Sequence, residues 1–211
     1  MSDRRCLPVV VAEPTGTGKT TVCREVVARD VHIVFSVSHT TRPRRQGAVD
    51  GRDYHFVDDE EFTRLAGEGA FLEWAVYNQR KYGTSMRAVD EPLARGLDVL
   101  LEIEVQGALQ VRQRRPDARF VFLLPPSMET LRQRLVGRGT DAPEEVERRL
   151  GVAARELRSV GDFDYAVPND DLEVCVADVL AVLAAERSGD TAGVRSRFDP
   201  ATRARALTQA S

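Results

Sequence analysis

The chain has 211 residues, of which 42% are hydrophobic and 30% charged, and its formal net charge at pH 7 is −3. A chain of this length and composition can bury one substantial core, and so small a net charge gives no general attraction to nucleic acid or to a membrane surface. No apolar run is long enough to span a bilayer. Three scattered cysteines without ligand or disulfide spacing favour a reducing compartment, so we expect a cytoplasmic protein.

The first 28 residues have the pattern of a strand, a glycine-containing turn and a helix. Residues 7–12 form an apolar run typical of a parallel strand that is covered on both faces. The turn ends in Gly-Lys-Thr-Thr, and the N–H groups of such a loop bind phosphate with the positive end of the following helix. Lys19 would reach the outer phosphates of a nucleoside triphosphate, and the Thr20 hydroxyl would bind Mg²⁺.

Glu13 departs from this phosphate-loop pattern, which has glycine at its position. A carboxylate about 4 Å from a phosphate would cost about 4 kcal/mol at an effective dielectric constant near 20. If Glu13 points away, the cost falls to that of screened charges. The alternative is a plain surface turn, but Lys19 is one of only two lysines in the chain and stands where phosphate binding needs it.

The next segment changes in character after a second buried strand at residues 31–35, which completes a βαβ-type unit. Residues 36–51 are polar, basic and rich in turn formers. The elements expected after them are a strand at 53–57, a helix at 59–66 capped by Asp58, and strands at 71–76 and 80–84. Such short elements leave no room for parallel crossovers, so we expect a small mixed subdomain.

The remainder alternates again between helices and strands. Helices are expected at 85–95, 105–114, 127–136, 143–157 and 171–186, and strands at 98–103, 119–124 and 163–167. The glycine-rich residues 137–141 predict a mobile break, and residues 188–211 a disordered tail. The arginines near residue 114 most simply complement a helix C-terminus, with a nucleic-acid patch as the alternative.

This alternation predicts an α/β fold, in which ligands bind beyond the carboxyl ends of the strands. The phosphate loop, the segment from residue 36 and the pair Glu102 and Glu104 all follow strands, so one crevice should hold them. Within that segment, arginines and tyrosines suit a phosphate monoester, although a solvated basic loop is an equal alternative in a chain with 28 arginines.

Six blocks make the sequence recognisable: Ser-Val-Ser-His-Thr-Thr-Arg-Pro-Arg-Arg from residue 36, Gly-Arg-Asp-Tyr-His-Phe from 51, Phe-Leu-Glu-Trp from 71, Tyr-Gly-Thr-Ser from 82, Leu-Leu-Glu-Ile-Glu-Val-Gln-Gly from 100 and Gly-Arg-Gly-Thr-Asp from 137. Together they resemble the guanylate kinase family over residues 7–186. The resemblance implies a P-loop parallel-sheet core flanked by helices (residues 1–35 and 85–187), a helical lid at about 137–150, and a mixed α/β GMP-binding insert (36–84).

The resemblance also implies an activity, transfer of the terminal phosphate of MgATP to GMP or dGMP, by a monomer or homodimer. The implied ATP contacts are Pro14, Thr15, Gly16, Thr17, Gly18, Lys19, Thr20, Thr21, Arg134, Arg138 and Asn169. The implied GMP contacts are Ser38, Arg42, Arg45, Tyr54, Glu73, Tyr82, Thr84 and Glu102. Catalysis is assigned to Lys19, Arg42, Arg138 and Arg149, and Mg²⁺ to Thr20, with Glu104 reaching it through water.

The assignment of Glu73 to guanine has a chemical basis. One carboxylate can accept the N1–H and the 2-amino group of guanine together. Adenine lacks that amino group and presents an acceptor at N1, so a buried carboxylate would discriminate by about 10⁴ or more.

Three residues depart from the family pattern: Glu13 for glycine, Glu104 for the common aspartate, and Ala48 for the usual glutamate. Glu13 motivates an alternative, a guanylate-kinase-like binding module with impaired catalysis. A further alternative is a related kinase that acts on another phosphorylated acceptor, such as a sugar.

Overall fold

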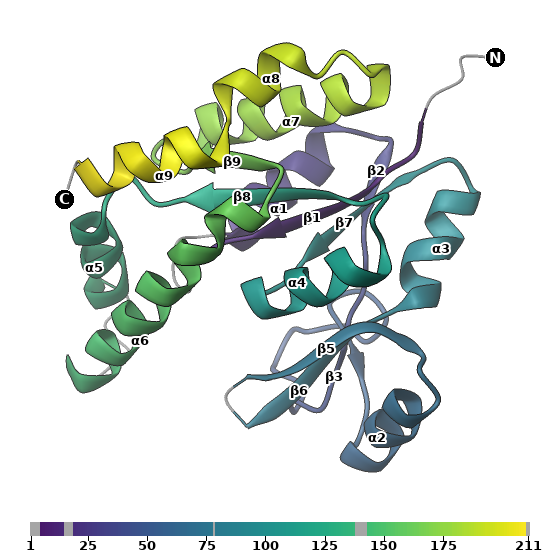
Figure 1. The fold of residues 1–211 in the computed structure, drawn as a ribbon. Coiled ribbons are helices and arrows are strands. Elements are labelled where there is room, and N and C mark those ends of the chain that lie inside the picture. The colour runs from purple at the N-terminus through teal and green to yellow at the C-terminus, as the bar shows by residue number, and fades with distance from the viewer. Residues whose placement is uncertain (1–4, 15–18, 78, 138–142, 210–211) are drawn as a thin grey trace.

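The computed structural model describes residues 5–14, 19–77, 79–137 and 143–209, which form two sheets with helices around them (Figure 1). The larger sheet is parallel throughout. Its strands, in spatial order, are β2 (Ile33–Phe35), β7 (Asp98–Glu102), β1 (Pro8–Ala12), β8 (Arg119–Leu124) and β9 (Tyr165–Pro168). The predicted α/β class with a parallel core is therefore confirmed.

Helices cover both faces of this sheet, because alternate residues of each strand point to opposite sides. On one face β1 contributes Val9 and Val11 to a core with α1 (Lys19–Arg29) and α7 (Leu172–Ser188). On the other, Val10 packs with residues of α3 (Met86–Ala94), α4 (Val105–Arg114) and the short 3₁₀ helix η1 (Leu157–Asp162). Two-sided burial accounts for the continuous apolar character of the strands.

The insert forms a second, mixed sheet below the first (Figure 1). Its strands, in spatial order, are β4 (His55–Phe56), β3 (His39–Thr40), β6 (Arg80–Ser85) and β5 (Phe71–Tyr77). Helix α2 (Asp59–Gly67) covers it, with Phe62 stacked on Phe71 at 4.6 Å between ring centroids. Only β3 and β4 pair in parallel, as the lack of crossovers leads one to expect.

Helix α4 of the core holds the edge of this second sheet. Gln110 accepts from the N–H of Trp74 at 3.3 Å and donates to its carbonyl at 3.0 Å. One helical turn further on, Arg114 donates to the carbonyl of Phe71 at 2.6 Å. These bonds satisfy main-chain groups that an edge strand would otherwise leave open and fix β5 against the core.

Local capping residues set several helix starts where the sequence predicts them. Asp58, Ser85 and Asp171 each accept a hydrogen bond from the backbone N–H three residues on, at 2.8, 3.2 and 3.0 Å. Helices α5 (Met128–Gly137) and α6 (Pro143–Glu156) pack on each other through a small apolar cluster. The predicted mobile break at residues 137–141 lies almost wholly outside the described residues.

The prediction of a disordered tail is wrong. Residues 188–211 include α8 (Ala192–Arg197) and α9 (Pro200–Gln209), which return across the core (Figure 1). Phe198 between them is fully buried, and its carbonyl accepts from Ala166 of β9 at 2.9 Å. Leu207 packs against the second core cluster. These few apolar side chains cover the end of the sheet, and the gain from burying them offsets the ordering of a polar segment.

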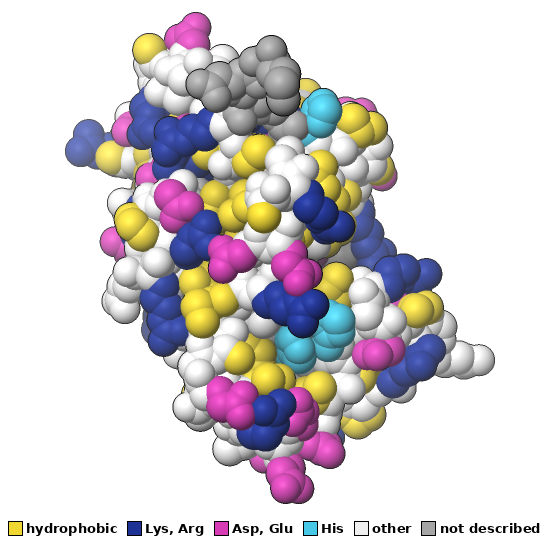
Figure 2. All heavy atoms as spheres, turned by 90° about the vertical axis from the view of Figure 1, so that its right-hand side faces the viewer, with side chains coloured by type: hydrophobic (Ala, Val, Ile, Leu, Met, Phe, Trp, Pro, Cys, Tyr) yellow, Lys and Arg dark blue, Asp and Glu magenta, His cyan; other side chains and the backbone are white. Residues whose placement is uncertain are grey.

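The surface carries both signs of charge. On the face in Figure 2, acidic and basic side chains are interspersed among hydrophobic ones. The arginines at the end of α4 lie against the protein, since Arg115 pairs with Asp117 at 3.0 Å and Arg112 lies 3.9 Å above the ring of Phe120. No helix among the described residues has both the length and the apolar character needed to cross a membrane.

Candidate active site

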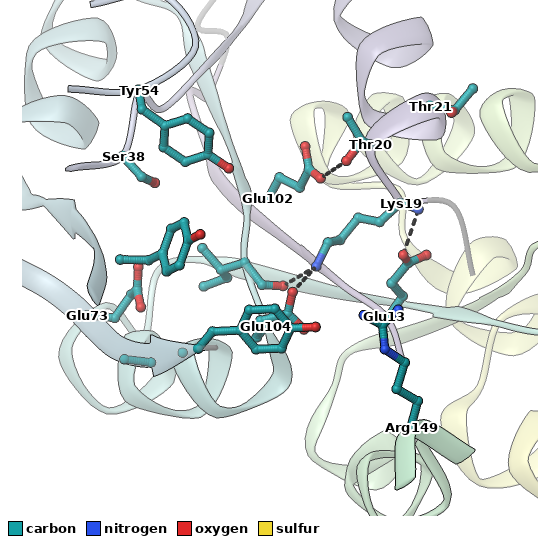
Figure 3. Close-up of a pocket in the computed structure, with 15 residues that line it drawn as sticks. Glu13, Lys19, Thr20, Thr21, Ser38, Tyr54, Glu73, Glu102, Glu104 and Arg149 are labelled. Carbon is teal, nitrogen blue, oxygen red and sulfur yellow. Dashed lines mark hydrogen bonds and ion pairs between the residues drawn. The ribbon is translucent and has the colours of Figure 1, made fainter. Parts of the chain in front are cut away.

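A cavity of about 450 Å³ opens where the two sheets meet, beyond the carboxyl ends of β1 and β7 (Figure 3). The core contributes the start of α1 and the ends of β1 and β7, and the second sheet contributes β5 and β6. Of the residues predicted from the sequence, it is lined by Lys19, Thr20, Thr21, Ser38, Tyr54, Glu73, Tyr82, Glu102, Glu104 and Arg149. The single crevice expected at the strand ends is thus present.

Lys19 lies buried at the base of this cavity. Its Nζ donates to the carbonyl of Ile103 at 2.9 Å and lies 3.4 Å from a carboxylate oxygen of Glu104. Burial alone would lower the pKa of Lys19, but the carboxylates of Glu104, Glu13 and Glu102 hold it above its ordinary value. Lys19 therefore stays protonated and keeps its charge near the site for phosphates.

Glu13 points toward the start of α1. Its Oε1 accepts the backbone N–H of Lys19 at 2.7 Å, and the side chain is only 5% exposed. Figure 3 shows this carboxylate at the start of α1, on the side of Lys19 away from Glu73. Of the two orientations that the sequence allows, the structure has the one in which the carboxylate turns toward the Lys19 backbone and not away from it.

Thr20 and Glu102, which both line the cavity, are hydrogen-bonded to each other. The Thr20 hydroxyl donates to the Glu102 carboxylate. The resemblance assigns Glu102 to guanine, whereas here it contacts the start of α1. Within the described residues, no group of three or more His, Cys, Asp or Glu side chains is arranged to hold a metal. The hydroxyl of Thr20 and the carboxylates of Glu102 and Glu104 are oxygen donors of the kind that Mg²⁺ prefers.

Glu73 forms the other end of the cavity with Thr84 and Ser38. Its Oε1 accepts from the backbone N–H of Thr84 at 3.0 Å and from the Thr84 hydroxyl at 2.7 Å. That hydroxyl lies 3.2 Å from the Ser38 hydroxyl. The antiparallel register of β5 and β6 creates this cluster by pairing Glu73 with Thr84. Burial raises the pKa of Glu73, and the two Thr84 bonds partly oppose that rise.

Arg42, Tyr54 and Tyr82 lie together beside this cluster. The guanidinium carbon of Arg42 is 5.2 Å from the ring centroid of Tyr54, whose ring is 6.0 Å from that of Tyr82. Arg45 is exposed, in a turn closed by a hydrogen bond from the Ala48 N–H to the Arg45 carbonyl at 3.1 Å. The structure thus brings three of the four predicted phosphate contacts together, whereas Arg45 is exposed and is not among the residues that line the cavity.

The predicted contacts for ATP come from several separate elements. Arg134 of α5 donates to the carbonyl of Asn169 at 3.1 Å, and Asn169 is almost fully buried. Arg149 of α6 reaches the cavity while its Nε donates to Glu145 at 3.1 Å. Pro14 is buried at the end of β1. The predicted residues Thr15, Gly16, Thr17, Gly18 and Arg138 lie outside the described residues.

The sequence reasoning missed Ala75, Tyr77 and Gly107, which also line the cavity. Ala75 and Tyr77 share a side of β5 with Glu73, so the two-residue period of that strand could have identified them. Gly107 of α4 faces Glu73 so closely that a Cβ placed on it would lie 2.7 Å from Glu73 Oε2. Nothing in the local sequence signals this contact, because it joins two distant elements.

Comparison with known proteins gives a consistent result. A family model described as guanylate kinase matches residues 5–186. The chain is 52% identical over 178 residues to a guanylate kinase of Thermus thermophilus, an alignment that covers 84% of this chain and 80% of the relative. It is 49% identical over 176 residues to a guanylate kinase of Dechloromonas aromatica, covering 83% and 87%. The crystal structure of guanylate kinase from Anaplasma phagocytophilum matches with a TM-score of 0.72 at 32% identity and covers 88% of each chain.

Proposed function

The chain belongs to the guanylate kinase family, and on that premise we propose that its cavity holds GMP and MgATP end to end, with Glu73 as the reader of guanine. The enzyme is an ATP:GMP phosphotransferase. A phosphate oxygen of GMP attacks the γ-phosphorus of ATP, and the bond from that phosphorus to the oxygen bridging to the β-phosphate breaks. The products are GDP and ADP.

One observation carries the assignment of the two ends. Glu73 is buried, held through Oε1 by Thr84, and lines the same cavity as Lys19. Its second oxygen and the fixed first one present acceptors to the N1–H and 2-amino group of guanine. The hydroxyls of Ser38 and Thr84 suit the O6 acceptor of the same base. The carboxylate selects against adenine, which would leave it without those donors.

The phosphate of GMP is assigned to the corner formed by Arg42, Tyr54 and Tyr82. A guanidinium and two phenol hydroxyls suit a dianionic monoester, because all three can donate to its oxygens. Tyr54 and Tyr82 line the same cavity as Glu73 and Lys19, so a monoester bound there would direct an oxygen toward the ATP side. Arg45 would join the phosphate after a side-chain movement.

Transfer is mostly a matter of alignment and charge stabilisation. Lys19 and Arg149 face the space between the two ends and supply positive charge to the moving phosphoryl group. Mg²⁺, bound by Thr20 and by ATP oxygens with Glu102 or Glu104 nearby, would neutralise phosphate charge when present. Proteins usually bind Mg²⁺ through one or two side chains and complete its shell with water and phosphates, which fits the donors here.

We assign the two substrates to the two sheets and the residues around them. Residues 1–35 and 85–187 would bind ATP, and residues 36–84 would bind GMP. The hydrogen bonds of Gln110 and Arg114 to β5 hold the second unit in register with the core.

A coupled assay of ADP release with GMP, dGMP, AMP, UMP and CMP as acceptors tests this function. We expect turnover with GMP to exceed turnover with AMP by about 10⁴-fold or more, because a buried carboxylate that accepts hydrogen bonds from guanine is left unpaired by adenine. Turnover without preference for guanine would contradict the role of Glu73. A sugar phosphate as the preferred acceptor would have the same consequence.

The alternative of a binding module without catalysis, motivated by Glu13, has little support. Lys19 is buried and charged, Thr20 is in place, and Arg149 faces the cavity. Calorimetric titration with MgATP separates the two alternatives, because a module that has lost catalysis has no need of an ATP site.

A further inference from the structure

Glu13 occupies the one position of the phosphate-loop pattern at which this chain replaces glycine with an acidic residue. It follows β1 directly, and its side chain turns inward, with 5% of its surface exposed. Its Oε1 accepts the backbone N–H of Lys19 at 2.7 Å (Figure 3). Glu13 therefore places an anionic oxygen at the backbone N–H that begins α1.

The N–H that Glu13 accepts has a second use. Lys19 is the first residue of α1, and the first N–H groups of a helix have no acceptor within it. In a phosphate loop these groups, aided by the helix dipole, bind the phosphate oxygens of a nucleotide. A carboxylate oxygen and a phosphate oxygen accept the same hydrogen with similar geometry. The bond from Glu13 therefore occupies a donor that the phosphates of ATP would use.

The charges around Lys19 act in the same direction. Besides Glu13, Glu104 lies 3.4 Å from its Nζ, and Glu102 also raises its pKa. Among the described residues that line the cavity, the acidic ones are Glu13, Glu73, Glu102 and Glu104, and the basic ones are Lys19 and Arg149. Among these described residues the carboxylates outnumber the cations, and the Glu13 carboxylate is the one that reaches the backbone at the start of α1.

We propose that Glu13 is a built-in competitor for the phosphates of ATP: its carboxylate takes the place of a phosphate oxygen at the Lys19 amide and sets a weaker affinity for ATP than the same cavity would otherwise have. This proposal rests on the proposed function, since it concerns the nucleotide end of that cavity. It leaves the GMP end unaffected, because Glu73 and Thr84 form their cluster without Glu13.

Two substitutions distinguish competition from a purely structural role. Glu13→Gln removes the charge but keeps an oxygen that can accept the Lys19 N–H, and Glu13→Ala removes both. A competitor predicts that ATP binds more tightly in both variants, and most tightly in Glu13→Ala. If Glu13 instead only stabilises the loop, ATP should bind more weakly in both variants and most weakly in Glu13→Ala, because loss of the hydrogen bond would loosen the loop. Glu25→Gln, which removes a charge from α1 at a partly exposed position, is the matched control.

The test is isothermal titration calorimetry of the full chain and these three variants with MgATP, with inorganic tripolyphosphate and with GMP. We expect the Kd for MgATP and tripolyphosphate to fall about tenfold or more in Glu13→Ala and by less in Glu13→Gln. The Kd for GMP should stay unchanged in every variant, and Glu25→Gln should match the unmodified chain throughout.

An unchanged or raised Kd for MgATP in both Glu13 variants, with GMP binding intact, would overturn the competitor while leaving the kinase assignment in place. Failure of every protein, including the unmodified chain, to bind MgATP would instead remove the proposed function. Thermal unfolding of each variant, with and without GMP, shows whether it is folded and keeps these outcomes separate.

Discussion

Gly107→Ala should damage GMP recognition although Gly107 itself has no proposed contact with the nucleotide. The Cβ of the new alanine would lie 2.7 Å from Oε2 and 3.3 Å from Cδ of Glu73, whereas ordinary contacts begin near 3.4 Å. Helix α4 cannot easily retreat, because Gln110 and Arg114 on the same face tie it to β5. The Glu73 carboxylate must therefore move, and the hydrogen bonds that it accepts from Thr84 or from guanine must lengthen.

The magnitude follows from the bonds at risk. A hydrogen bond to a charged group contributes about 1.5 to 3 kcal/mol, so misplacing the carboxylate should raise the KM for GMP by about 10- to 150-fold. The substitution itself favours the helix, since alanine is better than glycine there by about 1 kcal/mol. Loss of stability is thus not expected to obscure the effect.

Steady-state kinetics with each substrate varied in turn provide the assay. The KM for GMP should rise, while the KM for ATP changes by less than about twofold. Gly67→Ala is the matched control, because that helical glycine has nothing within 4 Å of an added Cβ. A Gly107→Ala enzyme with normal KM for GMP would show that the close approach to Glu73 has no bearing on specificity.

Three other predictions concern charge, the phosphate corner and the tail. Burial raises the pKa of Glu73, and guanine binding needs the ionised carboxylate. The kcat/KM for GMP should therefore fall on acidification at a higher pH than an ordinary glutamate would give. A pH profile without any fall on the acidic side would argue against this. Arg42→Gln should raise the KM for GMP by at least about tenfold and leave the Kd for MgATP unchanged by calorimetry; equal losses for both substrates would misplace the phosphate corner. Phe198→Ala should lower the free energy of unfolding in urea by about 3 to 5 kcal/mol with kcat retained in the folded enzyme, whereas a neutral result would mean that the tail does not stabilise the core.

Sequence patterns were sufficient wherever structure depends on near neighbours. The caps at Asp58, Ser85 and Asp171 involve a bond to a residue three positions away, and the strands of the core appear as apolar runs because both faces of the sheet are covered. Sequence patterns failed for the C-terminal tail, residues 188–211. Phe198 and Leu207 are isolated apolar residues in a polar segment, and their burial depends on a sheet end that local periodicity cannot reveal.

The residues of the site likewise fall into those that the sequence could assign and those that required the structure. Lys19 and Thr20 could be assigned from the phosphate-loop pattern alone, whereas the assignment of Glu73 to guanine came from the family resemblance. The contact of Glu73 with Gly107 joins elements more than thirty residues apart, and the orientation of Glu13 became visible only through its hydrogen bond to the N–H of Lys19. Such arrangements arise from tertiary packing, so they required the structure.

The most direct test of this account is the selectivity of a Glu73→Gln enzyme among GMP, IMP and AMP. Glutamine keeps an oxygen for Thr84 but turns a donor toward the base, where guanine also presents donors. We expect kcat/KM for GMP to fall by at least about 100-fold and the preference for GMP over IMP, which lacks the 2-amino group, to collapse. An unchanged order and ratio among the three nucleotides would contradict the claim that Glu73 reads the purine.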